Sequence, residues 1–344
     1  MLLSLSELAG GRAAAPLLDG AGQVVDPLLA VDLDAAPDPG LLRAACEAAG
    51  ASDRILVGVR TGEPPGEPWH ELLAALDVTL ARAPLETCVA GAGVDQLTAA
   101  ANANPQAALA LAQVLYAGRG LGVRAALDVE SFAYSTLLGG AEFGRWLAAR
   151  GPRPLPPAAT VPPVLVERAA DRLGITLNRP ERRNAYGREL RDGLVDALRV
   201  AVLDPTVAAV TLSGAGPAFC SGGDLDEFGT APDTATAHFV RTRGGAGELL
   251  HRVADRTEVR LHGPCVGAGI ELAAFAGRVV ARPDARFRLP EVGMGLIPGA
   301  GGTVSIPRRI GRWRALYLAL SGTWLDAATA ARWGLVDAVE RDGE

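Results

Sequence analysis

Three glycine-rich segments in the second half of the chain carry the residues best suited to chemistry. They are GPAFCSGGDL (216–225), HGPCVGAGIEL (262–272) and RLPEVGMGLIPGAGGT (288–303). The first follows an expected buried strand, and its glycines leave backbone N–H groups free to point at a ligand oxygen. The second passes from a strand into a helix that begins near Ala268, where first-turn N–H groups have no partner inside the helix. Each segment taken alone also fits a simple turn.

Two glutamates in these segments are candidates for proton transfer. Glu291 stands between Pro290 and Val292, where loss of hydration raises a carboxyl pKa and keeps a proton available near neutrality. Glu271 follows the second glycine-rich turn. A lone glutamate of this kind is usually exposed or ion-paired. Together, however, two donor sites and two acids suit reactions at the carbon beside a thioester carbonyl, because N–H donors stabilise negative charge on its oxygen.

The elements expected to position these residues alternate between strand and helix. The 188–203 segment has Leu190, Leu194, Leu198 and Val202 on one face, which is typical of an amphipathic helix. Other expected helices cover 236–254, 271–276, 303–310, 313–321 and 326–333. Expected strands cover 164–169, 172–178, 207–214, 258–263, 279–281 and 287–289. This βα repeat predicts an α/β fold.

The first half of the chain begins with a weaker version of the same pattern. Segments 25–34, 54–62 and 86–93 are predicted strands, and 70–83 is a predicted helix. Predicted helices follow at 105–116, 121–138 and 142–150. The proline-rich stretch 151–163 then predicts an extended linker.

Composition excludes several classes of function. Four cysteines without CxxC spacing predict buried free thiols and neither a disulfide framework nor a metal site. A net charge of −6, with no lysine and no arginine-rich block, argues against nucleic-acid binding. Hydrophobic residues reach 49%, but charges interrupt every apolar run, so no membrane span is expected. The first residues lack a basic region before their apolar run, so we expect a cytoplasmic protein.

Residues 164–340 resemble the crotonase, or enoyl-CoA hydratase/isomerase, superfamily. The resemblance rests on five ordered motifs: LNRPERRNAYG, LSGAGPAFCSGGDL, GPCVGAGIEL, FRLPEVGMGLIPGAGGT and LSGTWLDAATAARWGLVDAV. It implies the crotonase (ClpP/crotonase-like) spiral of ββα units. It also implies an acyl-CoA thioester substrate, no cofactor beyond the CoA that arrives with it, and a homo-oligomer, either trimer or hexamer.

The resemblance assigns roles to individual residues. The backbone N–H groups of Ser221 and Ala268 match the two oxyanion-hole donors. Glu271 matches the glutamate that holds or activates water, and Glu291 matches the one that exchanges a proton with the α-carbon. This pair is typical of hydratases that add water syn across a trans-2-enoyl-CoA to give a 3-hydroxyacyl-CoA. Double-bond isomerisation, hydrolysis, secondary-metabolism chemistry and a non-catalytic acyl-CoA-binding role remain alternatives.

The resemblance also implies contacts with the CoA ester. The matching positions are Arg183, Ala185, Cys220, Gly222, Asp224, Leu225 and Gly267. Arg183 is suited to a phosphate because a guanidinium can bind it with two hydrogen bonds, although a solvated loop charge is an equal alternative. The family places acyl specificity in the segment 228–245, and no residue in this sequence stretch predicts a particular acyl chain.

The domain organisation follows from a second, partial resemblance upstream. Residues 1–100 resemble a degenerate crotonase half, and 101–150 resemble the helices that end a crotonase subunit and cover its active site. The linker 151–163 then leads into the catalytic core, 164–344. An unrelated helical appendage is the alternative. We expect 101–150 to cover the acyl pocket, with its apolar residues at helical spacing.

Overall fold

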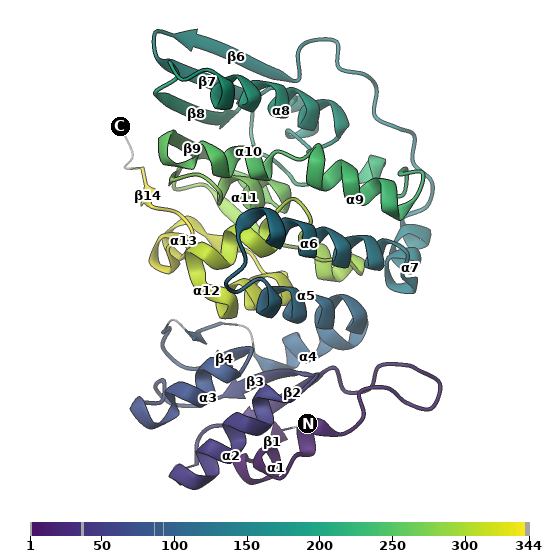
Figure 1. Cartoon of the computed structure of the whole chain (residues 1–344), viewed down its shortest axis with the longest axis vertical. Helices are drawn as coiled ribbons and strands as arrows, with labels where there is room; N and C mark the ends of the chain where they lie inside the picture. Colours follow the sequence, from purple (N-terminus) through teal and green to yellow (C-terminus); the bar gives the residue numbers. More distant parts are fainter. Residues whose placement is uncertain (1, 36–37, 86, 92, 341–344) are drawn as a thin grey trace.

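The computed structural model describes residues 2–35, 38–85, 87–91 and 93–340, and the chain forms a layered α/β structure (Figure 1). Parts of two expectations lie outside the described residues: Glu86 and Ala92 in the strand predicted at 86–93, and positions 341–344 of the predicted core. None of the described helices combines the length and apolar character that crossing a membrane requires.

The larger sheet of the second half has six strands in the order β14-β11-β9-β8-β7-β6. Only β6 and β7 pair antiparallel, and the other neighbours are parallel. The strands are β6 (Val164–Ala169), β7 (Arg172–Leu177), β8 (Ala209–Gly214), β9 (Thr257–Leu261), β11 (Arg278–Ala281) and β14 (Ala338–Val339). A parallel order of this kind needs a crossover between strands, which the intervening helices supply.

A smaller sheet lies beside it, and the chain enters this sheet after β9 and again after β11. Its strands, in the order β10-β12-β13, are β10 (Pro264–Val266), β12 (Arg286–Arg288) and β13 (Leu325–Asp326). The helices are α8 (Arg188–Leu203), α11 (Ala268–Ala273), α12 (Gly302–Ser321) and α13 (Ala327–Trp333). The turns β9-β10-α11 and β11-β12-α12 thus pass through both sheets before a helix begins. This repeat of strand, strand and helix confirms the α/β class expected from the sequence.

Two helix predictions were wrong in extent. The helix predicted at 236–254 is divided into α9 (Thr234–Arg243) and α10 (Gly247–Arg252), because Gly244 and Gly245 break the pattern between them. The helix predicted at 70–83 ends early, as α3 (His70–Ala75), and the chain continues as strand β4 (Val78–Leu80). Pairing of β4 with its neighbouring strand outweighs the local helical pattern there.

The first half is a five-stranded parallel sheet in the order β1-β2-β3-β4-β5. The strands besides β4 are β1 (Leu2–Leu3), β2 (Leu28–Asp32), β3 (Ile55–Val59) and β5 (Cys88–Val89). One face, with Leu29 and Leu56, packs on α1 (Leu5–Ala9), α2 (Pro39–Gly50) and α3. Alternate residues such as Ile55 face the opposite way and join the core that continues into the second half. Sequence periodicity missed α2.

Four helices follow this sheet in the chain. They are α4 (Val94–Ala103), α5 (Pro105–Ala117), α6 (Val123–Leu138) and α7 (Ala141–Arg150). The helical segment therefore begins at Val94, and α4 runs across the boundary expected at residue 101. Helix α4 lies next to the sheet, whereas α6 lies against the second half (Figure 1). Helix α5 packs on α12, and α6 packs on α9.

A buried ion pair joins α12 to the first half. Arg312 is only 6% exposed, and its Nη1 lies 3.4 Å from Oδ1 of Asp77. Its Nη2 donates to the carbonyls of Ala74 at 2.6 Å and Leu76 at 2.9 Å. The indole N–H of Trp313 donates to the same Leu76 carbonyl at 3.1 Å. The end of α3 is therefore tied to the middle of α12 by charged and polar contacts.

We predict that Arg312→Ala destabilises the whole chain. Removing one member of a buried pair typically costs about 3–5 kcal/mol, which corresponds to a loss of roughly 4–7 °C in Tm for a chain of this size. Thermal unfolding followed by circular dichroism measures the change. Arg199→Ala is the matched control, because Arg199 forms an exposed pair with Asp196 and should shift Tm very little. Equal Tm values for both variants would contradict the prediction.

Candidate active site

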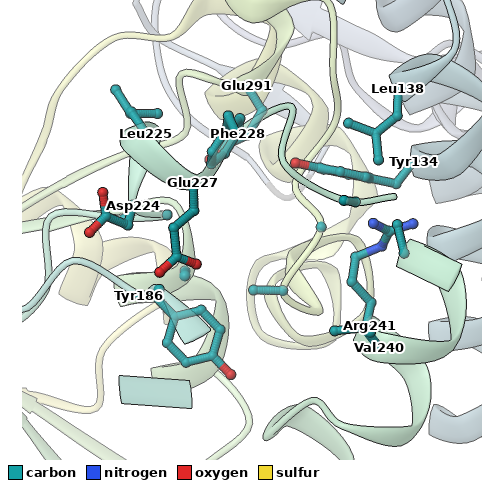
Figure 2. Close-up of a pocket in the computed structure, with 18 of the residues that line it drawn as sticks. Tyr134, Leu138, Tyr186, Asp224, Leu225, Glu227, Phe228, Val240, Arg241 and Glu291 are labelled. Carbon is teal, nitrogen blue, oxygen red and sulfur yellow. The ribbon is translucent and has the colours of Figure 1, made fainter. Parts of the chain in front are cut away.

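A cavity of about 1300 Å³ contains both candidate acids, Glu271 and Glu291, in its wall. Figure 2 shows side chains entering it from two sides. Tyr186, Asp224 and Glu227 lie on one side, and Tyr134 and Arg241 lie on the other. The upstream helices α6 and α7 contribute much of the lining. The expectation that these helices cover the pocket is therefore met within one chain.

Two glycine-rich loops meet at the floor of this cavity. Cys220 and Cys265 form a parallel β-bridge, and the Val266 N–H donates to the Cys220 carbonyl at 3.0 Å. A Cβ at Gly269 would lie 2.4 Å from that same carbonyl, so a side chain there would prevent the close approach of α11. The glycine thus allows the loop after β8 and the start of α11 to lie side by side.

The backbone donors differ from the sequence prediction at one of two positions. The Ser221 N–H donates to the Arg183 carbonyl at 3.0 Å, so it is not available to a ligand. Two residues later, the N–H of Gly223 has no acceptor among the described residues, and Gly223 lines the cavity. We therefore replace Ser221 with Gly223 as the candidate donor. Ala268 opens α11 and also lines the cavity, and its N–H has no helical partner.

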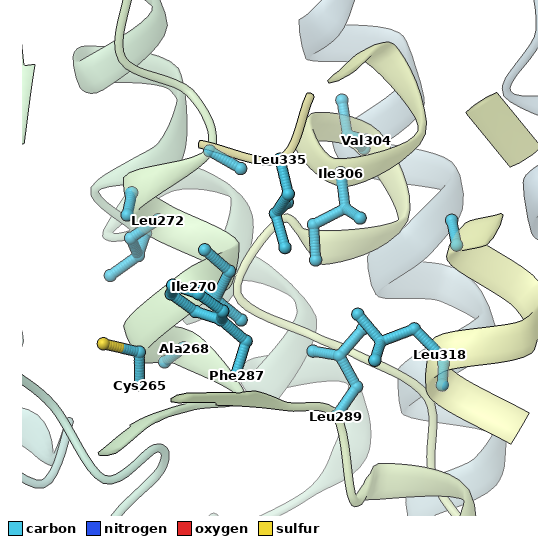
Figure 3. Close-up of a cluster of buried hydrophobic side chains, with 14 of the residues drawn as sticks. Cys265, Ala268, Ile270, Leu272, Phe287, Leu289, Val304, Ile306, Leu318 and Leu335 are labelled. Atoms are coloured by element: carbon cyan, nitrogen blue, oxygen red, sulfur yellow. The ribbon is translucent and has the colours of Figure 1, made fainter. Parts of the chain in front are cut away.

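A buried apolar cluster fixes the direction of α11. Figure 3 shows Ile270 of this helix beside Phe287, and Leu272 on another side of the helix; both belong to the same buried cluster. Phe287 is fully buried on the central strand of the smaller sheet. Since alternate sides of the short helix are held in this core, the intervening Glu271 side chain is directed into the cavity.

Glu271 is a buried carboxylate held by the loop at 298–303. Its Oε2 accepts N–H groups from Ala300 at 2.7 Å and Gly302 at 2.9 Å. A Cβ at Gly302 would lie 2.6 Å from Cγ of Glu271, so only glycine permits this approach. Burial raises the pKa of Glu271 well above its ordinary value, and the negative charges of Glu291 and Glu130 raise it further.

Glu291 opens the short 3₁₀ helix η6 (Glu291–Met294) and is less constrained. Its Oε2 is buried and has no hydrogen-bond partner among the described residues. Its Oε1 lies where a Cβ at Gly267 would come within 2.5 Å, and Gly267 has a positive φ of 47°. Burial raises the pKa of Glu291 to about 8. A carboxyl group in this state carries a proton near neutrality and can donate it into the cavity.

A third buried acid, Glu130, reaches the site from α6. Its Oε1 accepts the Gly301 N–H at 2.8 Å, and its Oε2 accepts the N–H and hydroxyl of Thr303 at 2.9 and 2.7 Å. Burial raises its pKa to about 7. Four successive N–H groups, from Ala300 to Thr303, therefore alternate between Glu271 and Glu130. This loop connects the upstream helix to the candidate catalytic acid.

The predicted CoA contacts occupy two kinds of position. Gly222, Asp224 and Leu225 line the cavity. Asp224 accepts two hydrogen bonds from Arg182, which fixes the loop next to the Gly223 donor. The other predicted contacts do not line the cavity: Arg183, Ala185, Cys220 and Gly267.

These four residues lie outside the cavity wall, and three of them make backbone contacts or are buried near it. Arg183 is exposed in a left-handed turn with φ 53°. Ala185 lies in the same turn, where its N–H donates to the Arg182 carbonyl. Cys220 is buried, and burial raises the pKa of its thiol to about 12. The N–H of Gly267 donates to the Arg288 carbonyl at 2.9 Å. The roles of these residues toward CoA stay predictions.

Sequence reasoning missed the cavity face of α6. Leu127, Glu130, Tyr134 and Leu138 follow one another at helical spacing, and all four line the cavity. The sequence feature that could have indicated this face is a glutamate and a tyrosine at helical spacing among apolar residues. Arg241 of α9 was missed as well, because nothing in its local sequence indicates that it reaches the same cavity.

We predict that Glu291→Gln stabilises the protein in a pH-dependent way. Between its ordinary pKa of 4.5 and about 8, the folded chain keeps a proton that the unfolded chain has lost, so the contribution of Glu291 to stability falls as pH rises. The variant should therefore gain Tm over the wild type across this range and level off above about pH 8. Thermal unfolding at several pH values tests this, with the exposed Glu167→Gln as control. A pH-independent difference would refute it.

Comparison with known proteins places this geometry in a family. The family model described as enoyl-CoA hydratase/isomerase matches residues 168–343. The probable enoyl-CoA hydratase echA8 of Mycobacterium bovis is 37% identical over 179 residues, which is 51% of this chain and 68% of that protein. The 1,2-epoxyphenylacetyl-CoA isomerase of Escherichia coli is 36% identical over 167 residues, which is 47% of this chain and 63% of that protein.

A solved structure shows a similar extent of match. The carnitinyl-CoA dehydratase from Mycobacterium avium is 40% identical, and the alignment covers 53% of this chain and 72% of that chain with a TM-score of 0.47. Residues 168–343, which the family model matches, contain both donor loops and both candidate acids, Glu271 and Glu291. The chain belongs to the enoyl-CoA hydratase/isomerase family.

Proposed function

We propose that this protein is an enoyl-CoA hydratase that adds water syn across a trans-2-enoyl-CoA to give a 3-hydroxyacyl-CoA. The observation that carries the proposal is the presence of two buried acids, Glu271 and Glu291, in the wall of one cavity with two free backbone donors. Reactions that need a single proton-transfer group do not require this pair. The CoA enters as part of the substrate, and the proposed chemistry uses no other cofactor.

The two donors act on the thioester. The N–H groups of Gly223 and Ala268 donate to the thioester oxygen, which becomes more negative as water adds to the β-carbon. Donors that are already in place stabilise this charge without reorganisation, and each contributes about 3–4 kcal/mol to lowering the barrier. The proximity of the two loops at Cys220 and Cys265 supports this arrangement of the donors.

The two acids divide the proton transfers. Glu291, protonated near neutrality, gives its proton to the α-carbon. In the reacting state the pair carries one proton, on Glu291, and Glu271 is a carboxylate, the form that the N–H groups of Ala300 and Gly302 favour. Glu271 holds the water through the oxygen that these N–H groups leave free, and it takes up the proton that the water loses. Both acids approach the same backbone position, since a Cβ at Gly267 would lie 2.5 Å from Oε1 of Glu291 and 3.6 Å from Oε1 of Glu271, and this supports addition of the hydroxyl and the proton to one face. Because the acids interact strongly, their titration belongs to the pair as a whole.

Double-bond isomerisation is the second candidate, and a relative from Mycosarcoma maydis named enoyl-CoA isomerase/hydratase, 36% identical over 174 residues, favours keeping it. In that reaction a single acid relays a proton between two carbons, and no water is added. The two reactions therefore differ in whether Glu271 is required. Assembly as a trimer or hexamer stays a prediction.

We predict that Glu271→Gln and Glu291→Gln each lower the rate of crotonyl-CoA hydration by about 10²- to 10⁴-fold. Loss of enoyl absorbance measures the rate, and binding of acetyl-CoA, which should persist, shows that each variant still folds. A Glu271→Gln enzyme with an unchanged hydration rate would exclude the hydratase mechanism. A Glu271→Gln variant that still isomerises 3-enoyl-CoA would support the isomerase alternative.

We predict that Ala268→Pro lowers kcat by about 10²- to 10³-fold, the usual cost of losing one oxyanion donor. Position 268 is the first residue of α11, where proline suits helical geometry, so the change removes the N–H with little distortion. Ala268→Gly keeps the N–H and is the matched control. Ser221→Ala should also keep most of the activity, because its N–H already binds the Arg183 carbonyl. Full activity in Ala268→Pro would remove this donor from the mechanism.

A further inference from the structure

The end of the cavity between α6 and α9 contains an arginine that the proposed reaction does not use. Arg241 lines the cavity, whose wall also includes the apolar residues Leu127, Leu138 and Val240. In Figure 2 its guanidinium lies beneath the Tyr134 ring, on the side opposite Asp224 and Glu227. An arginine in an apolar wall is costly, because burial removes water from a permanent charge. Its presence therefore calls for a specific reason.

The side chain of Arg241 is held in place by its neighbours. Its Nε donates to the Ser131 hydroxyl at 3.1 Å, and its Nη2 donates to the Ser131 carbonyl at 3.3 Å and to the Ser135 hydroxyl. Its Cζ lies 4.5 Å from the centre of the Tyr134 ring. His238 Nδ1 lies 3.0 Å from the same Ser131 hydroxyl and supports this arrangement from behind. The guanidinium is thus oriented before any ligand arrives.

The charge of Arg241 nevertheless lacks a carboxylate partner. Within the described ranges, no Asp or Glu oxygen lies within 4.0 Å of it, and its Nη1 has no hydrogen-bond acceptor. The acid that it influences, Glu130, has both oxygens occupied by Gly301 and Thr303. Burial lowers the pKa of Arg241, as expected for a cation without an ion pair. One guanidinium edge therefore remains available to a ligand in the cavity.

The position of Arg241 indicates which part of a substrate it meets. The proposed oxyanion donor Gly223 is followed by Asp224, on the far side of the cavity from Arg241 (Figure 2). Tyr134 lies next to Arg241; burial raises the pKa of Tyr134, the Arg241 charge opposes this, and the nearby acids Glu291 and Glu271 add to it. With the thioester at the donors and the reacting carbons at the acids, Arg241 lies beyond them. It faces the far end of the acyl chain.

We propose that Arg241 binds a carboxylate at the far end of the acyl chain, so that the preferred substrates are CoA esters of dicarboxylic acids. The inference rests on the proposed function only in taking an acyl-CoA as the occupant of the cavity. A guanidinium matches a carboxylate in charge and geometry, and the apolar residues around it fit the methylene chain between the two ends. Arg241 is then a specificity residue and takes no part in the proton transfers.

Calorimetric binding tests the proposal without relying on turnover. The ligands are glutaryl-, adipoyl- and suberyl-CoA, each compared with the neutral acyl-CoA of the same chain length. We expect the wild type to bind at least one dicarboxylyl ester about tenfold or more tighter than its neutral match. Arg241→Gln should abolish this preference, and Arg241→Lys should keep part of it. Arg243→Gln is the matched control, because Arg243 lies on the same helix but pairs with Asp128 outside the cavity.

The outcomes separate this proposal from the hydratase proposal. Equal wild-type binding of charged and neutral esters, or an Arg241→Gln variant that loses affinity for both equally, overturns the role of Arg241. The second result would identify it as a counter-charge for Glu130 and Tyr134. Crotonyl-CoA hydration without a carboxylate preference refutes this inference alone. A carboxylate preference without hydration of any enoyl ester refutes only the proposed reaction. No binding of any acyl-CoA overturns both.

Discussion

The site depends on how one short loop satisfies two buried carboxylates. Successive N–H groups at 300–303 point alternately to Glu271 and Glu130, and Thr303 adds its hydroxyl. An unpaired buried carboxylate is very costly, so the loop conformation and the two acids stabilise one another. The backbone can alternate in this way because Gly301 has φ 105° and Gly302 carries no side chain against Glu271. The other carboxylate oxygen of Glu271 takes its position from this arrangement.

The same loop makes the upstream helices part of the site. Glu130 comes from α6, and its neighbours on that helix form the wall facing α9. Behind α6, α5 packs on α12, and Arg312 of α12 reaches the end of α3 in the first half. One buried core therefore runs from the first sheet to the cavity. The acids Glu130, Glu271 and Glu291 are buried where this continuous packing meets the cavity.

Much of the fold and of the site can be predicted from the sequence, because it depends on the local spacing of apolar residues and glycines. Amphipathic spacing predicts α8, and the glycine-rich turns predict that Glu271 and Glu291 share one site, as the cavity shows. The donor at Gly223 was not predictable in that way, because the Ser221 N–H is engaged by a carbonyl contributed by a separate turn. Arg241 was missed for a similar reason. Its function depends on which helix lies opposite, and local periodicity carries no information on that.

The contribution of α6 also has a consequence for stoichiometry. The Glu130 carboxylate and the Glu271 carboxylate belong to one polypeptide, joined by the stretch 151–163, so every site carries its third acid in a ratio of one to one. Dilution cannot separate them, as it can separate parts supplied by different subunits. The linker converts a contact that would otherwise depend on protein concentration into an intramolecular one with a fixed effective concentration. The environment of the two acids is therefore set by folding alone, whatever assembly the chain forms.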